Sequence, residues 1–197
     1  MPCYPDRINE HFLEPRNVGH LAGAEACAEA ASFTCGALLR LSLEIEAETK
    51  RVADSRFKAA GCGYLIAAAS VVTEIIKGLT AAEAATAAGL IQETLIEYFG
   101  APPPDKAHCA ALCSQALREA VARYSRHVRD EWTGEEALIC TCFGISEKRI
   151  EQVISQKSLH TVREVTMACN AGGGCQSCRP LIEEILEEHW REPEDRF

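Results

Sequence analysis

The sequence predicts an α+β protein, in which a small antiparallel sheet packed with helices is followed by a small, mostly helical domain. Three observations support this prediction. Residues 39–46 alternate strictly between apolar and polar side chains, and residues 52–59 follow them after a short turn. From residue 61 the apolar spacing changes to that of helices. Beyond residue 137, serines stand where they would cap further helices.

The alternating segment "LRLSLEIE" predicts a half-buried strand. Its polar side chains point to one face, and the other face carries Leu39, Leu41, Leu43 and Ile45. "AETKR" is expected to turn the chain, and Val52–Ala59 to return as a second strand.

Three helices are expected in the rest of the first half. "GCGYLIAAASVVTEIIKGL" ends at Gly78, and its apolar stripe is Leu65, Ala69, Val72 and Ile76. Thr80 and Glu83 have the spacing of a capping box for a second, short helix. After "GAPPPDKAH" a long helix is expected over about 109–129, with one side formed by Leu112, Ala116, Ala120 and Tyr124.

A glycine and a cluster of charges in "RDEWTGEEA" indicate a linker. We therefore expect a first domain over 1–130, a linker over 131–137, a second domain over 138–190 and a tail over 191–197.

Three helices are expected in the second domain. Ser146 can cap one that runs through Ile154, and Ser158 can cap another that runs through Met167. "PLIEEILEEHW" then forms the last helix, with Pro180 near its first turn.

Composition excludes several classes of protein. The net charge of -9 argues against binding to a nucleic-acid backbone. The longest uncharged run, Ala59–Thr73, is shorter than the roughly 20 residues that a membrane span needs, and no signal-type segment opens the chain, so a cytoplasmic location without membrane contact is expected. Eleven cysteines in a reducing compartment favour metal or redox chemistry over disulfides.

Four cysteines form two chelating pairs in the second domain. Cys140 and Cys142 make a C-x-C pair, and Cys175 and Cys178 make a C-x-x-C pair after 32 intervening residues. Each pair can present two soft sulfurs to one metal centre. Four such ligands suit zinc or an iron–sulfur cluster, and spacing alone does not choose between them.

The residues around these pairs favour a cluster. "GGG" at 172–174 leaves backbone amides free to approach bridging sulfides, and Arg179 and the pair Lys148–Arg149 offer counter-charge to an anionic centre. Cys169 is a fifth thiol nearby, and we expect it to be a bystander.

The second half resembles the small [2Fe–2S] domain of bacterioferritin-associated ferredoxins, which also lies at the centre of NifU-type proteins. The motifs "CTCFGISEKRIEQVI" and "GGGCQSCRPLIEEIL" carry this resemblance over about residues 138–188. It implies a permanent [2Fe–2S] cluster held by Cys140, Cys142, Cys175 and Cys178.

Three further cysteines fall where predicted elements meet. Cys35 precedes the first strand, Cys62 stands between a strand and a helix, and Cys109 opens the long helix beside His108. The dipole at a helix N-terminus lowers the pKa of a thiol, and this argument applies to Cys62 and Cys109. Each cysteine alone would more often be a buried apolar residue, but three at such junctions indicate a site.

The first half resembles the NifU/IscU family of iron–sulfur scaffolds over about residues 4–126. The matching motifs are "HFLEPRNVGHL", "TCGALLRLSLEI", "FKAAGCGYLIAAASVVTEIIKG" and "PPDKAHCAAL". The resemblance implies that Cys35, Cys62 and Cys109, with His108 adjacent, hold a transient [2Fe–2S] cluster, or iron or zinc in the isolated protein. It also implies a homodimer, a cysteine desulfurase as sulfur donor and apo-proteins as acceptors. "PRNVG" would belong to the surface that meets the sulfur donor.

Three features depart from the family pattern. Ala37 stands where the family usually has aspartate, so a cluster on this half is expected to persist longer. "PPPDK" is not the full chaperone-binding motif of the IscU branch, so a dedicated Hsp70 partner is not expected. The sequence ends at Phe197 without the further C-x-x-C domain of full-length NifU proteins. Cys3, Cys27 and Cys113 match nothing in the pattern, and ordinary packing is expected for Cys113.

Two other functions stay open at this point. In the first, the protein is a [2Fe–2S] ferredoxin-type electron carrier whose first domain only docks a partner. In the second, it is a zinc protein throughout. An enzyme is not expected, because the chain has neither a nucleophile-elbow pattern nor a phosphate-binding glycine loop.

Overall fold

The computed structural model describes residues 4–33, 35–47, 49–130, 134 and 136–191. The chain divides into two compact units, Met1–Tyr124 and Ser125–Phe197. Most of the predicted linker, nearly all of the predicted tail and Cys3 lie outside the described residues.

The first unit is built around a three-stranded antiparallel sheet in the order β1 (Ala26–Ser32), β2 (Ala37–Ile45) and β3 (Val52–Ala60). Ser32 lies opposite Ala37, and Leu38 lies opposite Ala60. Both strands that the sequence predicts are therefore confirmed to within two residues, and the α+β class is confirmed. β1 was not predicted.

The alternation in β2 explains how the sheet is covered. Leu39, Leu41 and Leu43 are buried, whereas Leu38 and Arg40 are exposed; Ser42, which was expected on the polar face, is buried as well. Burying three leucine side chains stabilises the fold by roughly 1.5–3 kcal/mol each before entropy is counted. This face of the sheet therefore holds much of the core.

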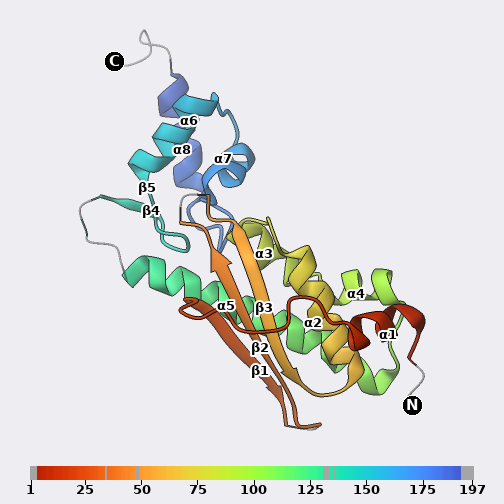
Figure 1. Ribbon diagram of the computed structural model, residues 1–197. Helices are drawn as coiled ribbons and strands as arrows, with labels where there is room; N and C mark the ends of the chain where they lie inside the picture. Colours follow the sequence, from red (N-terminus) through yellow and green to blue (C-terminus); the bar gives the residue numbers. More distant parts are fainter. Residues whose placement is uncertain (1–3, 34, 48, 131–133, 135, 192–197) are drawn as a thin grey trace. The chain divides into compact units, whose positions relative to one another are not determined.

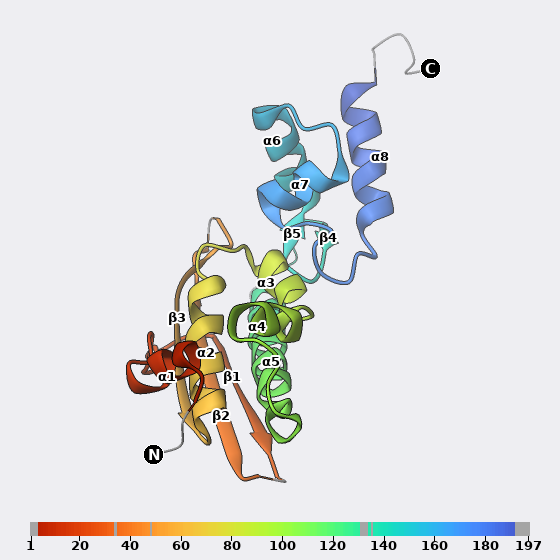
Figure 2. The ribbon, with the colours of Figure 1, turned by 90° about the vertical axis from the view of Figure 1, so that its right-hand side faces the viewer.

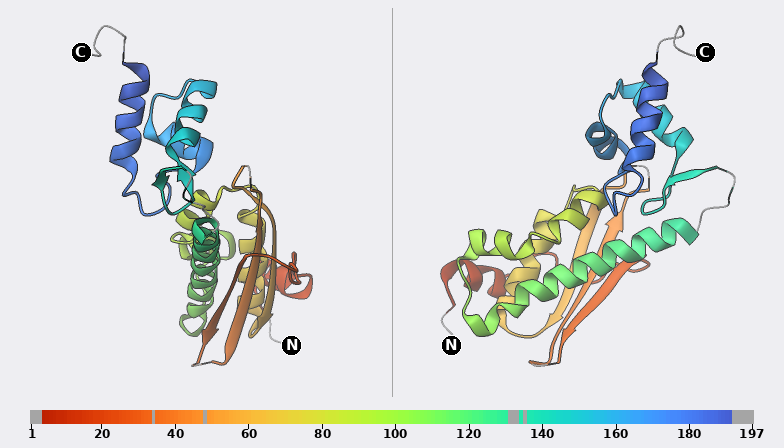
Figure 3. Two further views of the ribbon diagram at one scale, coloured as in Figure 1. Left: turned by 90° about the vertical axis from the view of Figure 1, so that its left-hand side faces the viewer. Right: turned by 180° about the vertical axis from the view of Figure 1, so that it is seen from behind.

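Helices cover the buried face. Figures 1 and 2 show α2 beside β3 and α1 beside α2, and the view from behind in Figure 3 shows the long helix α5 crossing the strands. The helices are α1 (Asp6–Leu13), α2 (Gly63–Ile75), α3 (Ala81–Ala87), α4 (Ile91–Phe99) and α5 (His108–Asp130), and a 3₁₀ turn η1 spans Pro104–Lys106.

Three helix predictions are confirmed in this unit. The predicted stripes of α2 and α5 are buried throughout. The capping box of α3 is present, because the Thr80 hydroxyl accepts from the Glu83 N–H at 3.2 Å and the Glu83 carboxylate accepts from the Thr80 N–H at 2.8 Å. α1 and α4 were not predicted.

The segment "PRNVG" lies against the sheet as an ordered arm. The Phe57 N–H donates to the Asn17 carbonyl at 3.0 Å, and the Gly19 N–H donates to the Phe57 carbonyl at 2.8 Å. The arm is thereby fixed along the edge of β3.

The second unit contains a two-stranded ribbon and three helices. These are β4 (Leu138–Cys140), β5 (Ile145–Ser146), α6 (Glu147–Lys157), α7 (Val162–Cys169) and α8 (Arg179–Trp190). Its core includes Ile150, Ile154 and Ile182, all fully buried. In the described part of the chain, no helix is both long and apolar enough to cross a membrane.

One predicted cap in this unit is wrong. Ser146 caps α6 as expected, but Ser158 ends that helix in the left-handed conformation with φ of 50° and does not begin the next one. Thr161 caps α7 instead, in a capping box with Glu164. The prediction failed because it relied on a single serine, whereas Thr161 and Glu164 have the more specific spacing of a capping box.

Candidate functional site

Four side chains from three parts of the first unit converge, and we call them the N-terminal thiol site: Cys35, Cys62, His108 and Cys109. Cys35 lies in the turn between β1 and β2, Cys62 is the N-cap of α2, and the other two open α5. Elements that are distant in sequence thus present their first or last residues at one place.

Short distances join these side chains. The Cys35 Sγ lies 3.2 Å from His108 Nε2, the Cys109 Sγ lies 3.8 Å from the same nitrogen, and the Sγ atoms of Cys62 and Cys109 are 3.6 Å apart. The structure thus brings together all four residues that the sequence singled out in this half. Within the described residues, no three His, Cys, Asp or Glu side chains are already spaced to hold one metal ion.

The three thiols differ in their access to solvent and in their acidity. Cys35 is exposed, Cys62 is half-buried, and Cys109 is only 3% exposed. Hydrogen bonds from the Ser32 hydroxyl and the Ala37 N–H, with the nearby charge of Lys106, lower the pKa of Cys35. Burial, followed by the neighbouring Cys62, raises the pKa of Cys109. The expectation that the helix dipole would acidify Cys109 is therefore wrong, because desolvation outweighs the dipole there.

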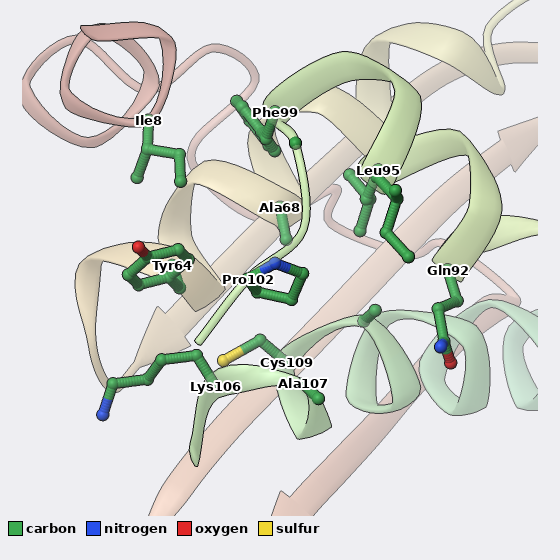
Figure 4. A pocket seen from close by; sticks show the side chains of 13 residues that line it. Ile8, Tyr64, Ala68, Gln92, Leu95, Phe99, Pro102, Lys106, Ala107 and Cys109 are labelled. Atoms are coloured by element: carbon green, nitrogen blue, oxygen red, sulfur yellow. The ribbon is translucent and has the colours of Figure 1, made fainter. Parts of the chain in front are cut away.

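A small apolar cavity of about 140 Å³ adjoins Cys109. Figure 4 shows the Cys109 sulfur at its edge, near Lys106 and Pro102, with Tyr64 and Phe99 among the other lining side chains. The cavity offers space into which the buried thiol can turn when the site is loaded.

Two residues near this site were missed by the sequence reasoning. The Lys106 ammonium pairs with Asp105 at 2.9 Å and lies close enough to Cys62 and Cys109 for their charges to raise its pKa, after the larger effect of Asp105. Its place in "PDKAHC" could have indicated a cation beside the thiols. The Tyr4 hydroxyl accepts from the Gly63 N–H at 3.3 Å, next to Cys62, and no local sequence signal pointed to this contact.

Ala37 lies at the edge of the N-terminal thiol site. It is 4% exposed, and a Cβ built on Gly61 would stand 3.3 Å from its own Cβ. Position 37 therefore faces the turn that leads into Cys62, and it supplies no oxygen ligand there.

The second unit brings together the four cysteines of the two chelating pairs, which we call the C-terminal thiol site: Cys140, Cys142, Cys175 and Cys178. The first two lie at the β4–β5 turn, and the other two lie in the loop between α7 and α8. After the larger effect of burial, the nearby charge of Cys175 raises the pKa of Cys142, and that of Cys140 raises the pKa of Cys178, so the thiols of the two loops lie close to one another. Two pairs separated by 32 intervening residues thus form one set of sulfur donors.

The glycine-rich loop allows close contact with the first pair. A Cβ built on Gly174 would lie 2.8 Å from the Cys142 Cβ and 3.0 Å from its Sγ, so a larger residue would push the two loops apart. Arg179 donates from Nε to the Gly172 carbonyl at 3.2 Å, which holds a cation next to Cys178. Cys169 is buried and its Sγ donates to the Val165 carbonyl at 3.3 Å.

This site is more enclosed than the N-terminal one. Cys140 and Cys178 are buried, Cys142 is half-buried and Cys175 is exposed. The Ser177 hydroxyl lowers the pKa of Cys175 to about 7, whereas burial raises the pKa of Cys178 to about 11 and also raises that of Cys142. Four soft donors, a glycine cradle and an adjacent guanidinium fit a tetrathiolate iron–sulfur cluster.

Comparison with known families agrees with both halves. The model for the NifU-like N terminal domain matches residues 3–131, and the model for the BFD-like [2Fe–2S] binding domain matches residues 138–188. These two matches take in both thiol sites.

The chain is also similar to individual proteins. The chain is 36% identical over 196 residues to a nitrogen fixation protein NifU of Nostoc sp., which covers 94% of this chain and 63% of the relative. It is 34% identical over 123 residues to the iron–sulfur cluster assembly scaffold protein IscU 1 of Archaeoglobus fulgidus, covering 62% of this chain and 77% of the relative. The crystal structure of a NifU-like protein (N-terminal) from Brucella abortus aligns with a TM-score of 0.48 at 20% identity, covering 60% of this chain and 91% of the other.

The chain spans less than two thirds of the length of the NifU relatives that it matches. The match to the first family model extends over more than half of the sequence. The chain therefore belongs to the NifU family, with a NifU-like N-terminal domain followed by a BFD-like [2Fe–2S] binding domain.

Proposed function

We infer that the protein is a scaffold on which iron–sulfur clusters are assembled and from which they are transferred. The N-terminal thiol site would carry the cluster that is built and passed on, as its cargo. The C-terminal thiol site would keep a permanent [2Fe–2S] cluster. The observation that carries the proposal is the convergence of Cys35, Cys62, Cys109 and His108 at one place, apart from a second and complete set of four thiols.

Sulfur would arrive from a cysteine desulfurase as a persulfide. A thiolate of the N-terminal thiol site attacks the outer sulfur of the donor persulfide, the donor's S–S bond breaks, and the donor cysteine leaves as a thiolate. Converting that sulfur to sulfide needs two electrons, which an external reductant must supply. Lys106 supports these steps by holding a positive charge beside the anionic sulfurs.

Release requires that the cargo is not held too tightly. Cys35 is exposed and its thiol contacts His108, so an acceptor protein can reach this side of the site first. Cys109 lies at the buried end and beside the cavity, where it can retain contact until the acceptor ligands have replaced the others. The graded exposure of the thiols thus suits stepwise ligand exchange with an apo-protein.

The C-terminal thiol site would serve electron transfer or structure. When bound, a [2Fe–2S] cluster supplies one-electron chemistry. Cys140, Cys142, Cys175 and Cys178 would hold it, Gly174 would let the two loops close on it, and Arg179 would offset its negative charge.

Anaerobic reconstitution with ferrous iron, a desulfurase and cysteine tests the proposal. The unsubstituted protein should gain a second visible chromophore beyond its resident one, and should then activate an apo-ferredoxin. The triple variant Cys35→Ser, Cys62→Ser, Cys109→Ser should lose both properties while keeping its original colour. Cys27→Ser is the matched control, because this thiol lies in β1 beside Ser42, and it should behave like the unsubstituted protein.

The same experiment separates the alternatives. A ferredoxin-type electron carrier would lose nothing essential in the triple variant. A zinc protein would be colourless from the start, because zinc thiolates do not absorb visible light. Zinc in the N-terminal thiol site alone would not contradict the proposal, provided that iron and sulfide can replace it.

A further inference from the structure

The second unit contains a buried side-chain amide without a partner. Asn170 is 0% exposed, and in the described part of the chain neither its Nδ2 nor its Oδ1 has a hydrogen-bond partner. Leaving such groups unpaired costs roughly 1–3 kcal/mol for each, so a native structure rarely tolerates it without a reason.

The position of Asn170 connects it to the C-terminal thiol site. It ends α7 in the left-handed conformation with φ of 66°, and it begins the loop that carries Cys175 and Cys178. The Gly173 N–H donates to the Asn170 carbonyl at 3.1 Å, which tightens this loop, and Gly174 then packs on Cys142. The unpaired amide therefore belongs to the loop that carries two of the four cysteines and contacts a third.

Neighbouring polar groups are already engaged. The Thr166 hydroxyl donates to the Ala171 carbonyl at 2.7 Å, the Cys169 Sγ donates to Val165, and the Arg179 Nε donates to Gly172. None of these contacts involves the Asn170 amide. Among the described residues, the Asn170 amide therefore has no hydrogen-bond partner.

The conformation alone does not require asparagine. Glycine is the usual residue at a left-handed helix end and would avoid the cost of burying an amide. The backbone conformation therefore does not account for the buried amide.

We propose that the Asn170 side-chain N–H donates a hydrogen bond to a sulfur atom of the cluster held by the C-terminal thiol site, and so raises its reduction potential. This rests on the proposed function, in which that site holds a [2Fe–2S] cluster. Reduction adds negative charge to the cluster, so a donor directed at a sulfur stabilises the reduced form more than the oxidised one.

Two substitutions test the effect on potential. Asn170→Gly keeps the left-handed backbone and removes the amide, and Asn170→Asp keeps the shape and replaces the donor with a carboxylate. Both should shift the midpoint potential to more negative values, the aspartate further than the glycine. Ser158→Gly is the matched control, because Ser158 is another left-handed helix end in the same unit. The midpoint potential of the cluster in this variant should equal that in the unsubstituted protein.

A spectroscopic measurement on the unsubstituted protein does not depend on how the variants fold. The chain has three asparagines, at positions 9, 17 and 170, and all can be labelled with ¹⁵N at the side-chain amide. Pulsed EPR of the reduced cluster should detect a ¹⁵N coupling in the unsubstituted protein, and this coupling should vanish in Asn170→Gly. Two results would overturn the inference. One is the absence of a ¹⁵N coupling in a protein with full iron and sulfide content, and the other is an unchanged midpoint potential in Asn170→Gly. Either result would assign the amide to an internal water. A protein without iron and sulfide would instead contradict the proposed function.

Discussion

The two thiol sites use the same ligand chemistry in different surroundings. The N-terminal thiol site draws its residues from three separate elements and exposes one of its thiols to solvent. The C-terminal thiol site draws four thiols from two short loops, and two of the four cysteines are buried. Ligands on separate elements can part when those elements move, whereas ligands on two short loops of one small unit have less freedom to separate. Under the proposed function, the scaffold around the sulfurs would therefore set how long each site retains a cluster.

The largest effect is expected where the enclosed site loses a ligand. Cys142→Ser should abolish the resident cluster and lower the melting temperature of the second unit, because metal binding contributes to folding. Visible absorption, iron analysis and calorimetry measure this. Cys169→Ser is the control, since that thiol is bonded to the Val165 carbonyl, and it should keep its full iron content. Loss of iron in the control would make Cys169 a ligand.

A second test compares the thiols within each site in the metal-free protein. Cys35 and Cys175 have lowered pKa values, and Cys109 and Cys178 have raised ones. A lower pKa gives a larger thiolate fraction at neutral pH, so the first two should be alkylated at least roughly tenfold faster at pH 7. The gap should narrow as pH rises toward 9 and beyond. Mass spectrometry after timed iodoacetamide treatment gives the order, and equal rates at pH 7 would contradict the described environments.

A smaller effect is expected from restoring a carboxylate beside the N-terminal thiol site. Ala37→Asp adds a negative charge and an oxygen ligand near the turn into Cys62, which should weaken the hold on an anionic cluster. Transfer to an apo-ferredoxin should accelerate by about fivefold, or about 1 kcal/mol, as is usual for one partly exposed charge. Ala37→Asn introduces a side chain of nearly the same shape as aspartate but without its charge, so it should change the transfer rate less than Ala37→Asp. Equal transfer rates for aspartate and alanine would refute this account of position 37.

The sequence predicted some strands and helices of the first unit and missed others. β2 was found because large apolar residues alternate with polar ones. β1 was missed because its buried residues Ala26, Ala28 and Ala30 are weak strand formers, and pairing with β2 decides their conformation. α4 could have been found from the buried pair Ile91 and Leu95, which has helical spacing.

The residues of the N-terminal thiol site could be selected from the sequence, but properties that depend on packing could not. Cysteine spacing and junction positions were enough to select Cys35, Cys62, His108 and Cys109, which the structure brings together. The raised pKa of Cys109 could not be predicted, because it depends on burial under residues far away in the sequence. The unpaired amide of Asn170 was equally hidden, since satisfaction of a hydrogen bond is a property of the packed unit.

Isotope tracing tests the central difference between the sites most directly. The resident cluster is formed with natural-abundance iron, the N-terminal thiol site is then loaded with ⁵⁷Fe and sulfide, and an apo-ferredoxin is added without oxygen. We predict that ⁵⁷Fe moves to the ferredoxin, as followed by Mössbauer spectroscopy, while the natural-abundance iron stays with the protein. Transfer of both isotopes in equal proportion, or of the resident iron first, would contradict the account.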